Sequence, residues 1–172
     1  MMYAGSGLAE LFDEVYETLF PLIYRIAFRI VGDSSIAEDV AQEAFIRYYE
    51  RAEPLPDMDQ TKYWLIRVVK NLSLNHEKKR GRERKMFSKL KEKAPVFSES
   101  GESEVMKKET GSIVREALME LPHNLRTVLV LKEYGHMNYK EIGSVLGISE
   151  GNVKVRVFRG REKLSRILKE KL

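Results

Sequence analysis

Cationic side chains concentrate near the C-terminus, within residues 139–161, which read YKEIGSVLGISEGNVKVRVFRGR. Lys154, Arg156 and Arg159 supply donors that can bond guanine edges or phosphate oxygens. Phe158 stands among them, and an aromatic side chain in that position can contact a thymine methyl group. These residue types favour recognition of duplex DNA, and that chemistry requires an element that fits the major groove.

A helix-turn-helix would present these side chains correctly, because its second helix enters the major groove. Asn138 can cap a first helix over 139–146, and Glu141 three residues later completes a capping box. Gly147 supplies the turn, since only glycine adopts a positive φ without strain. Ser149 can cap the second helix. The alternative is an ordinary helical hairpin with a charged surface, but caps, glycine and charges agree on the helix-turn-helix.

A second group of residues repeats every three or four positions within a predicted helix over 61–80. Amide side chains can read an unstacked base, aromatic rings can stack on it, and Arg or Lys can hold a phosphate. Core packing is the alternative role for the tryptophan, so the two asparagines carry this prediction. The face consists of Trp64, Arg67, Asn71, Asn75 and Lys78.

The elements that must position both groups are helices, since no strand pattern is convincing and no repeat is present. Apolar residues at helical spacing predict a helix over 8–31, which Pro21 kinks or divides. Ser35 and Glu38 can form a capping box for the next helix, which runs to about residue 51. Prolines then mark a loop through residue 60, and Thr61 is the expected N-cap of the third helix. Later helices are expected over 112–121, 124–134, 139–146 and 150–168.

Composition changes after the third helix, where residues 95–111 are rich in Ser, Glu and Gly. Such a stretch is typical of a flexible linker. We predict an all-α fold of two small helical domains joined by this linker, the C-terminal one a helix-turn-helix four-helix domain. The predicted parts are an N-terminal domain over 1–93, a linker over 94–111 and a C-terminal domain over 112–172.

Charge is distributed unevenly along the 172 residues, although the net charge is only +4. Residues 8–60 hold twelve acids and four bases, whereas residues 76–93 hold nine bases and three acids. Residues 154–172 hold eight bases and two acids. Solvated helix faces are the alternative, but the asymmetry favours two basic surfaces for a polyanion and one acidic surface for another partner.

Cysteine is absent, which excludes a disulfide framework and a thiolate metal site. No run approaches the ~18 apolar residues of a membrane helix, and the N-terminus lacks the pattern of a signal peptide. A cytoplasmic protein without membrane insertion is therefore expected.

The chain resembles a known family along nearly its whole length. The resemblance rests on Leu121-Pro122, Arg126 and Val128, and on the segments YRIAFRIVGD (24–33), AEDVAQEAFIRYY (37–49), WLIRVVKNLSLN (64–75), NYKEIGSVLGIS (138–149) and VKVRVFRGRE (153–162). Their order around a linker resembles the extracytoplasmic-function (ECF) sigma factors of the sigma-70 family. These are small alternative initiation subunits of bacterial RNA polymerase.

The resemblance implies that the C-terminal domain binds the promoter −35 element. Residues facing the groove would be Lys154, Val155, Arg156, Phe158 and Arg159. Supporting contacts to phosphate or base edges would come from Lys132, Tyr139 and Lys140. Val155 departs from the small polar residue that is common in the family motif, so the local base preference is expected to differ.

The resemblance also implies that the N-terminal domain binds and melts the −10 element. Asn71 and Asn75 would read bases, with Trp64, Arg67 and Lys78 beside them, and a loop over 57–61 would receive a flipped base. An acidic side of the second helix would dock on the polymerase, which suits a protein partner better than DNA. The docking residues would be Glu38, Asp39, Gln42 and Glu43. Implied partners are core RNA polymerase, promoter DNA and, as in many members, an anti-sigma factor.

Two other functions compete with this interpretation. One is a stand-alone regulator that binds DNA as a dimer, although the N-terminal half shows no receiver pattern. The other is an enzyme, but His76-Glu77 lacks the second histidine of a zinc-protease motif. His123 and His136 have no ligand partners at metal spacing, and the acids of the second helix lack an accompanying histidine. We therefore expect no catalytic residue, no metal and no cofactor.

Overall fold

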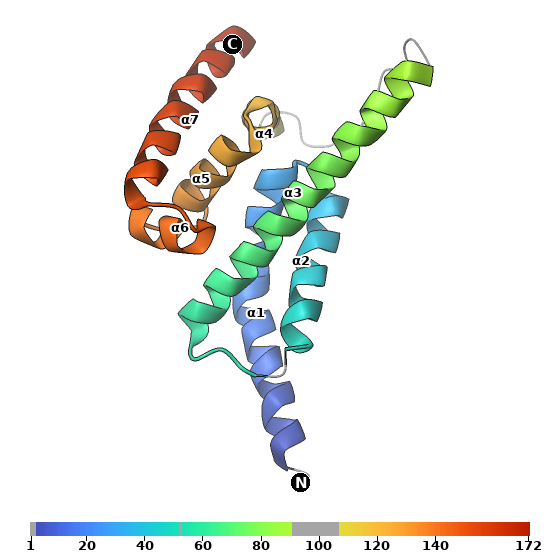
Figure 1. The fold of residues 1–172 in the computed structure, drawn as a ribbon, viewed down its shortest axis with the longest axis vertical. Helices are drawn as coiled ribbons and strands as arrows, with labels where there is room; N and C mark the ends of the chain where they lie inside the picture. Colours follow the sequence, from blue (N-terminus) through green and yellow to red (C-terminus); the bar gives the residue numbers. More distant parts are fainter. Residues whose placement is uncertain (1–2, 52, 91–106) are drawn as a thin grey trace.

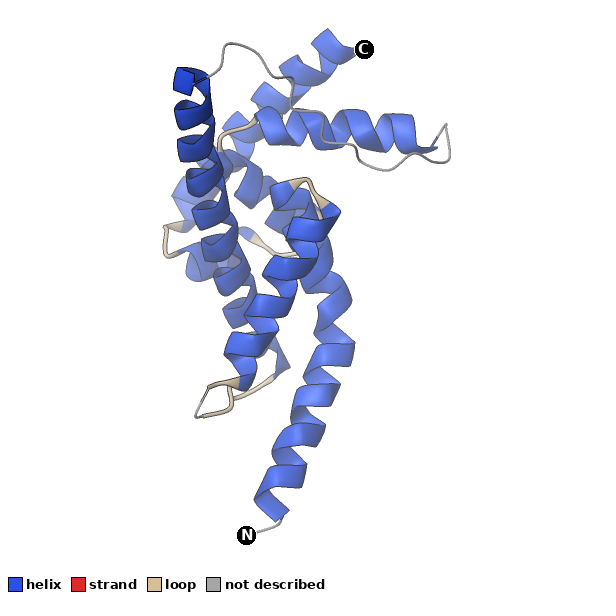
Figure 2. Cartoon of the chain, turned by 90° about the vertical axis from the view of Figure 1, so that its right-hand side faces the viewer, coloured by secondary structure: helices blue, strands red, loops and turns tan. Residues whose placement is uncertain are grey.

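The computed structural model describes residues 3–51, 53–90 and 107–172, all as helices and the loops that join them. The prediction of an all-α fold is confirmed: the described residues contain seven helices and no strand (Figures 1 and 2). In order, they are α1 (Tyr3–Val31), α2 (Ser34–Tyr49), α3 (Met58–Leu90), α4 (Lys107–Glu120), α5 (His123–Glu133), α6 (Tyr139–Leu146) and α7 (Glu150–Lys171).

Helices α1, α2 and α3 pack together as the N-terminal half. Apolar residues of α1 at helical spacing, among them Ile23, Ile26 and Ile30, are fully buried between the other two helices. The prediction that Pro21 divides this helix is wrong, because α1 continues through it without a break. Pro21 lies on the exposed side, where a proline's lost hydrogen bond can be replaced by water.

The beginnings of α2 and α3 differ from the sequence predictions. The side chain of Asp33, rather than Ser35, caps α2 by accepting a hydrogen bond from the Ile36 amide at 3.0 Å. The helix α3 begins at Met58, where the Asp57 carboxylate accepts from the Gln60 amide at 2.7 Å. Aspartate accepts such bonds as well as Ser or Thr does, so the sequence offered several equivalent caps. 

The helix α3 is the longest element, with 33 residues, and extends ten residues beyond the predicted end at residue 80. Its C-terminal part projects past the other helices of the N-terminal half (Figure 1). The predicted linker lies mostly outside the described residues, but α4 begins at Lys107, so residues 107–111 are helical rather than linker.

Helices α4 to α7 form the C-terminal half, in which α7 packs against α4, α5 and α6. Gly160 allows the close contact of α7 with α5, because a Cβ on it would lie 3.1 Å from the side chain of Leu129. Val153 and Val157 are buried on the same side of α7. The opposite side of α7, which carries the predicted groove-facing residues, therefore points away from the core.

The two halves pack against each other, with α4 and α5 against α1 and with α6 against α3. Arg126 of α5 lies at this contact and is 3% exposed. Its guanidinium donates to the carbonyls of Leu118 and Leu121, each at 2.8 Å, inside the C-terminal half. It also donates to the Ile30 carbonyl at 2.8 Å and pairs with Glu77, and both of these belong to the N-terminal half.

Candidate nucleic-acid interface

The predicted helix-turn-helix is present with its predicted helix starts and caps. Asn138 accepts a hydrogen bond from the Glu141 amide at 2.8 Å, and Ser149 accepts one from the Asn152 amide at 3.1 Å. Gly147 ends α6 with φ +69°, the left-handed conformation that glycine adopts without strain. A Cβ on Gly143 would lie 2.7 Å from the Ile148 carbonyl oxygen, so the tight turn requires glycine there as well.

The outward side of α7 presents the predicted groove-facing side chains. Phe158 is 68% exposed and Val155 is 45% exposed. Lys154 and Arg159 are also exposed, while Arg156 is half-buried. An exposed ring and an exposed branched side chain suit contact with base methyl groups better than a role in the core.

Local hydrogen bonds orient the polar groups of this helix. The Nε of Arg156 donates to the Asn152 side chain at 3.2 Å, and Lys154 lies 3.7 Å from the Glu150 carboxylate. Sequence analysis missed Asn152, although an exposed amide in the first turn of a recognition helix can bond adenine. The sequence did contain a signal: Asn152 directly precedes Val153, which was expected to pack inward, so its own side chain points in a different direction.

The residues predicted to support these contacts lie on α5 (Lys132) and on the first helix of the motif, α6 (Tyr139 and Lys140). The Nζ of Lys132 lies 5.0 Å from the ring of Tyr139, and both are half-buried, whereas Lys140 is exposed. Arg161 donates to Glu133 at 2.9 Å, and this hydrogen bond raises the pKa of the arginine. Arg161 is therefore held by the protein, which leaves Lys140 as the freer cation for a phosphate.

The predicted face of α3 is only partly open. Asn71, Asn75 and Lys78 are exposed. Trp64 is half-buried and packs against the core, with the guanidinium of Arg51 5.0 Å from its ring centre. The tryptophan thus has the packing role that was the alternative, and the asparagines are the residues free to meet a base.

The C-terminal half occupies the N-terminal end of this face. The Nε of Arg67 donates to the Val145 carbonyl of α6 at 3.1 Å. Burial, and next the negative charge of Glu141, raise the pKa of the Tyr63 hydroxyl. The tyrosine is on α3 and the glutamate on α6. In this arrangement α6 competes with any nucleic acid for the side chain of Arg67.

The segment predicted to receive a flipped base is not a loop over most of its length. Residues 58–61 form the first turn of α3, and only Asp57 precedes the helix. Thr61 is 3% exposed, and its hydroxyl donates to the Asp57 carbonyl at 2.8 Å. Thr61 is therefore not free to bond a base in this structure, and the prediction of a receiving loop over 57–61 is wrong in its backbone conformation.

The acidic side of α2 is exposed at Glu38, Asp39 and Gln42. Glu43 is half-buried and accepts a hydrogen bond from the Nε of Arg47 at 3.1 Å, so Arg47 offsets part of its charge. Further along the same helix, two apolar side chains face solvent: Ile46 is 50% exposed and Tyr49 is 69% exposed. Sequence analysis missed them, although their spacing from Gln42 places them on the same side of the helix.

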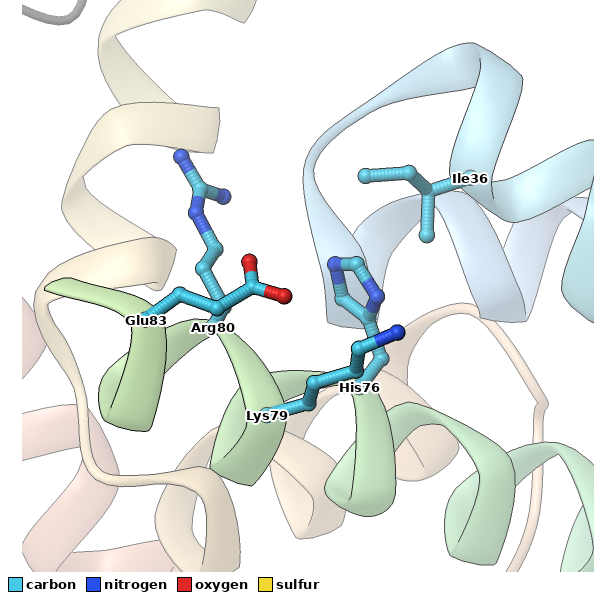
Figure 3. A pocket seen from close by; sticks show the side chains of 5 residues that line it. All are labelled: Ile36, His76, Lys79, Arg80 and Glu83. Atoms are coloured by element: carbon cyan, nitrogen blue, oxygen red, sulfur yellow. The ribbon is translucent and has the colours of Figure 1, made fainter. Parts of the chain in front are cut away.

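The three histidines differ in exposure: His76 and His123 are half-buried, whereas His136 is exposed. Among the described residues, no group of His, Asp and Glu is arranged to hold a metal ion. His76 lines a depression of about 280 Å³ together with Ile36, Lys79, Arg80 and Glu83 (Figure 3). Burial lowers the pKa of His123, whose Nδ1 lies 3.3 Å from the Thr127 hydroxyl. None of the described helices is long and apolar enough to cross a membrane.

Both halves of the chain match known protein families. Residues 15–83 match the family described as Sigma-70 region 2, and residues 112–164 match Sigma-70, region 4. The chain is 30% identical to the ECF RNA polymerase sigma factor SigW of Bacillus subtilis over 173 residues, covering 96% of this chain and 92% of that protein.

Two solved structures share the fold. The sigma factor RpoE of Bartonella quintana, solved with the anti-sigma factor NepR, matches with a TM-score of 0.66 at 21% identity, over 92% of this chain and 96% of that one. CnrH, solved with the cytosolic domain of CnrY, matches with a TM-score of 0.70 at 21% identity, over 99% of this chain and 96% of that one.

Proposed function

This chain belongs to the ECF sigma factors of the sigma-70 family, and we propose that it binds core RNA polymerase and directs it to promoters by reading a −35 and a −10 element. One observation carries the proposal. A single chain holds a face with two exposed asparagines inside its region 2 match and a helix-turn-helix inside its region 4 match. A stand-alone regulator would need only the second.

The −35 element is assigned to α7. We propose that five residues of its outward side face the major groove: Lys154, Val155, Arg156, Phe158 and Arg159. Lys132, Tyr139 and Lys140 would support them from α5 and α6. The exposure of Phe158 and Val155 supports this role, since exposed apolar side chains on a basic helix suit thymine methyl groups. 

The −10 element is assigned to the open face of α3. Asn71 and Asn75 would read an unstacked base, and Lys78 would hold a neighbouring phosphate. Arg67 would join them once it is released from the Val145 carbonyl, to which it donates at 3.1 Å. Trp64 would support the face from its half-buried position by fixing the helix against the core.

The surface for core polymerase is assigned to α2. Glu38, Asp39 and Gln42 would give electrostatic complementarity, with Glu43 contributing less because Arg47 pairs with it. Exposed Ile46 and Tyr49 would supply the apolar part that a protein interface needs at its centre.

Reading both elements at once requires the two halves to separate. The elements are centred about 25 base pairs apart, as their names state, which is about 85 Å of B-form duplex at ~3.4 Å per base pair. In the packed arrangement α6 contacts both α3 and α7, so their axes lie on the order of 20 Å apart, two helix diameters. The packed arrangement is therefore a closed state that precedes promoter binding.

The remaining assignments follow from family membership. We propose that the protein acts in the cytoplasm, that it has no catalytic activity of its own, and that the polymerase carries out RNA synthesis. We propose an anti-sigma factor as its regulator, because a structural neighbour was solved with one. The predicted division into domains over 1–93 and 112–172 suits two units that must separate, with the C-terminal unit extended back to the start of α4 at Lys107.

Run-off transcription with core polymerase tests the proposal, on promoters found by mapping start sites after expression of this protein. Arg156→Ala should weaken −35 recognition by about 1–3 kcal/mol if the arginine makes a bidentate base contact. Asn71→Ala should reduce permanganate reactivity of the bubble while binding to core polymerase is retained. Tight sequence-specific duplex binding by a dimer of the isolated protein, without core polymerase, would favour the stand-alone regulator and refute the assignment.

A further inference from the structure

The face of α3 that carries the proposed base readers continues towards the end of the helix. At 3.6 residues per turn, Arg82, Lys85 and Lys89 fall within the same arc of about 80° as Asn71 and Asn75. All three cations are exposed, and none forms an ion pair with another described residue. We call this line of side chains the cationic stripe: Lys78, Arg82, Lys85 and Lys89.

The helix surface is hollowed along the cationic stripe. A shallow depression of about 290 Å³ is lined by Lys78, Gly81, Arg82 and Lys85. Gly81 leaves its floor without a side chain, and a Cβ there would meet nothing within 4 Å. Glycine inside a helix is less stable than alanine, so helix formation does not explain this residue. A ligand that approaches the helix backbone closely would explain it.

The cationic stripe lies on a side of α3 that the other described helices leave exposed. The end of the helix projects beyond its neighbours (Figure 1). Other charged residues of the segment lie elsewhere: Lys79, Arg80 and Glu83 line the separate depression near Ile36 (Figure 3). Residues 78–90 contain seven bases and one acid. A partner that approaches the stripe therefore meets a strongly positive electrostatic potential.

We propose that the cationic stripe binds phosphates of the double-stranded DNA immediately upstream of the −10 element. The inference rests on the proposed function, since it takes Asn71 and Asn75 as the readers of that element. Lys78 and Lys89 are about 17 Å apart along the helix axis. A duplex of that length carries about ten phosphates on its two strands, so each cation of the stripe can reach one.

The side-chain chemistry favours duplex over a melted strand. Proteins that bind single strands combine cations with aromatic side chains on which the bases stack. The stripe has no aromatic or amide group, and the exposed Met86 and Phe87 lie outside its arc on the helix. Cations alone contact phosphates without reading sequence. Downstream of the −10 element the DNA is melted towards the start site, so the adjoining duplex is the upstream one.

The test compares two double variants in holoenzyme assembled with core polymerase. Arg82→Gln with Lys85→Gln removes two charges from the stripe. Lys79→Gln with Arg84→Gln removes one lysine and one arginine, both exposed, from other sides of the same helix segment. Affinity is measured over a range of KCl concentrations on two DNAs: a promoter fragment with upstream duplex, and a fork that ends at the upstream edge of the −10 element.

Loss of two phosphate contacts should make the slope of log K against log salt shallower by about 1.8. We expect this change for the stripe variant on the promoter fragment only, and not for the control variant. Equal slopes for both variants would overturn the proposal, as would a shallower slope that persists on the fork, because the contact would then be to polymerase or to the melted strand. If the unaltered holoenzyme bound neither DNA, the proposed function itself would fail.

Discussion

The ion pair between Glu77 and Arg126 joins the two halves of the protein, and its weakening should open the closed state. Arg126 is held by carbonyls of its own half, so it stays in place when the partner changes. In Glu77→Gln the side chain keeps its shape and one acceptor but loses its charge. The carboxylate is 24% exposed and the guanidinium 4% exposed, so solvent screens the pair only in part.

The magnitude follows from this burial. A hydrogen bond to a charged group contributes about 1.5–3 kcal/mol, and glutamine retains part of it. We expect the closed state to lose about 1–2 kcal/mol, which corresponds to about a 5- to 30-fold shift towards separated halves. The bond from Arg126 to the Ile30 carbonyl remains, so the closed state should be weakened rather than abolished.

Energy transfer between two dyes measures the shift, and the absence of native cysteine makes the labelling specific. Thr18→Cys on α1 and Ser165→Cys on α7 place the dyes at exposed positions in the two halves. Glu83→Gln, which removes an exposed carboxylate from α3 away from Arg126, is the matched control. Transfer efficiency in Glu77→Gln that equals that of the control would refute the role of this ion pair in holding the halves together.

Three further predictions concern single side chains. Phe158→Ala should leave the melting temperature unchanged, because the ring is 68% exposed, while footprinting shows weaker −35 protection; a lower melting temperature would place the ring in the core. Gly143→Ala should destabilise the helix-turn-helix by about 1–3 kcal/mol in urea unfolding, since a Cβ would lie 2.7 Å from the Ile148 carbonyl oxygen; an unchanged midpoint would contradict the geometry. Burial lowers the pKa of His123 from 6.5, so the unfolded state takes up the proton first and stability should fall as pH drops below about 6.5; His123→Gln should flatten that dependence, and unfolding curves at pH 7.5 and 5.5 compare the two.

The helix-turn-helix could be predicted from local sequence signals alone. The caps Asn138 and Ser149 and the turn glycine Gly147 act through bonds and dihedral angles of neighbouring residues, so their sequence spacing was sufficient. Where several equivalent caps stood close together, as at Asp33 and Ser35, the sequence could not choose among them. For the same reason the start of α3 was predicted at Thr61 although the helix begins at Met58. The predicted receiving loop was therefore placed on residues that are helical.

Exposure of a side chain depended on contacts between segments distant in the chain. The helical spacing of Trp64, Arg67 and Asn71 was readable, but periodicity does not say which members a neighbour covers. Trp64 packs against Arg51 and the core, and Arg67 donates a hydrogen bond to α6. Of the five predicted residues, Asn71, Asn75 and Lys78 therefore remain exposed without such a contact to another described helix. Likewise the exposed Ile46 and Tyr49 resembled core residues in sequence, because hydrophobicity alone does not show whether an apolar side chain is buried or exposed.

The sequence by itself determined the all-α class, the helix-turn-helix and the two groups of residues predicted to contact DNA, since these follow from local spacing, caps and charge. Only the tertiary structure decided that the halves pack together through Arg126, because its partners Ile30 and Glu77 lie far from it in the chain. It also decided which cations are tied to a distant segment, since Arg67 and Arg161 donate to acceptors on other helices, whereas the exposed cations of the stripe form no ion pair with another described residue. The physical reason is that a side chain's type sets what it can bind, while its folded neighbours set whether it is free to do so.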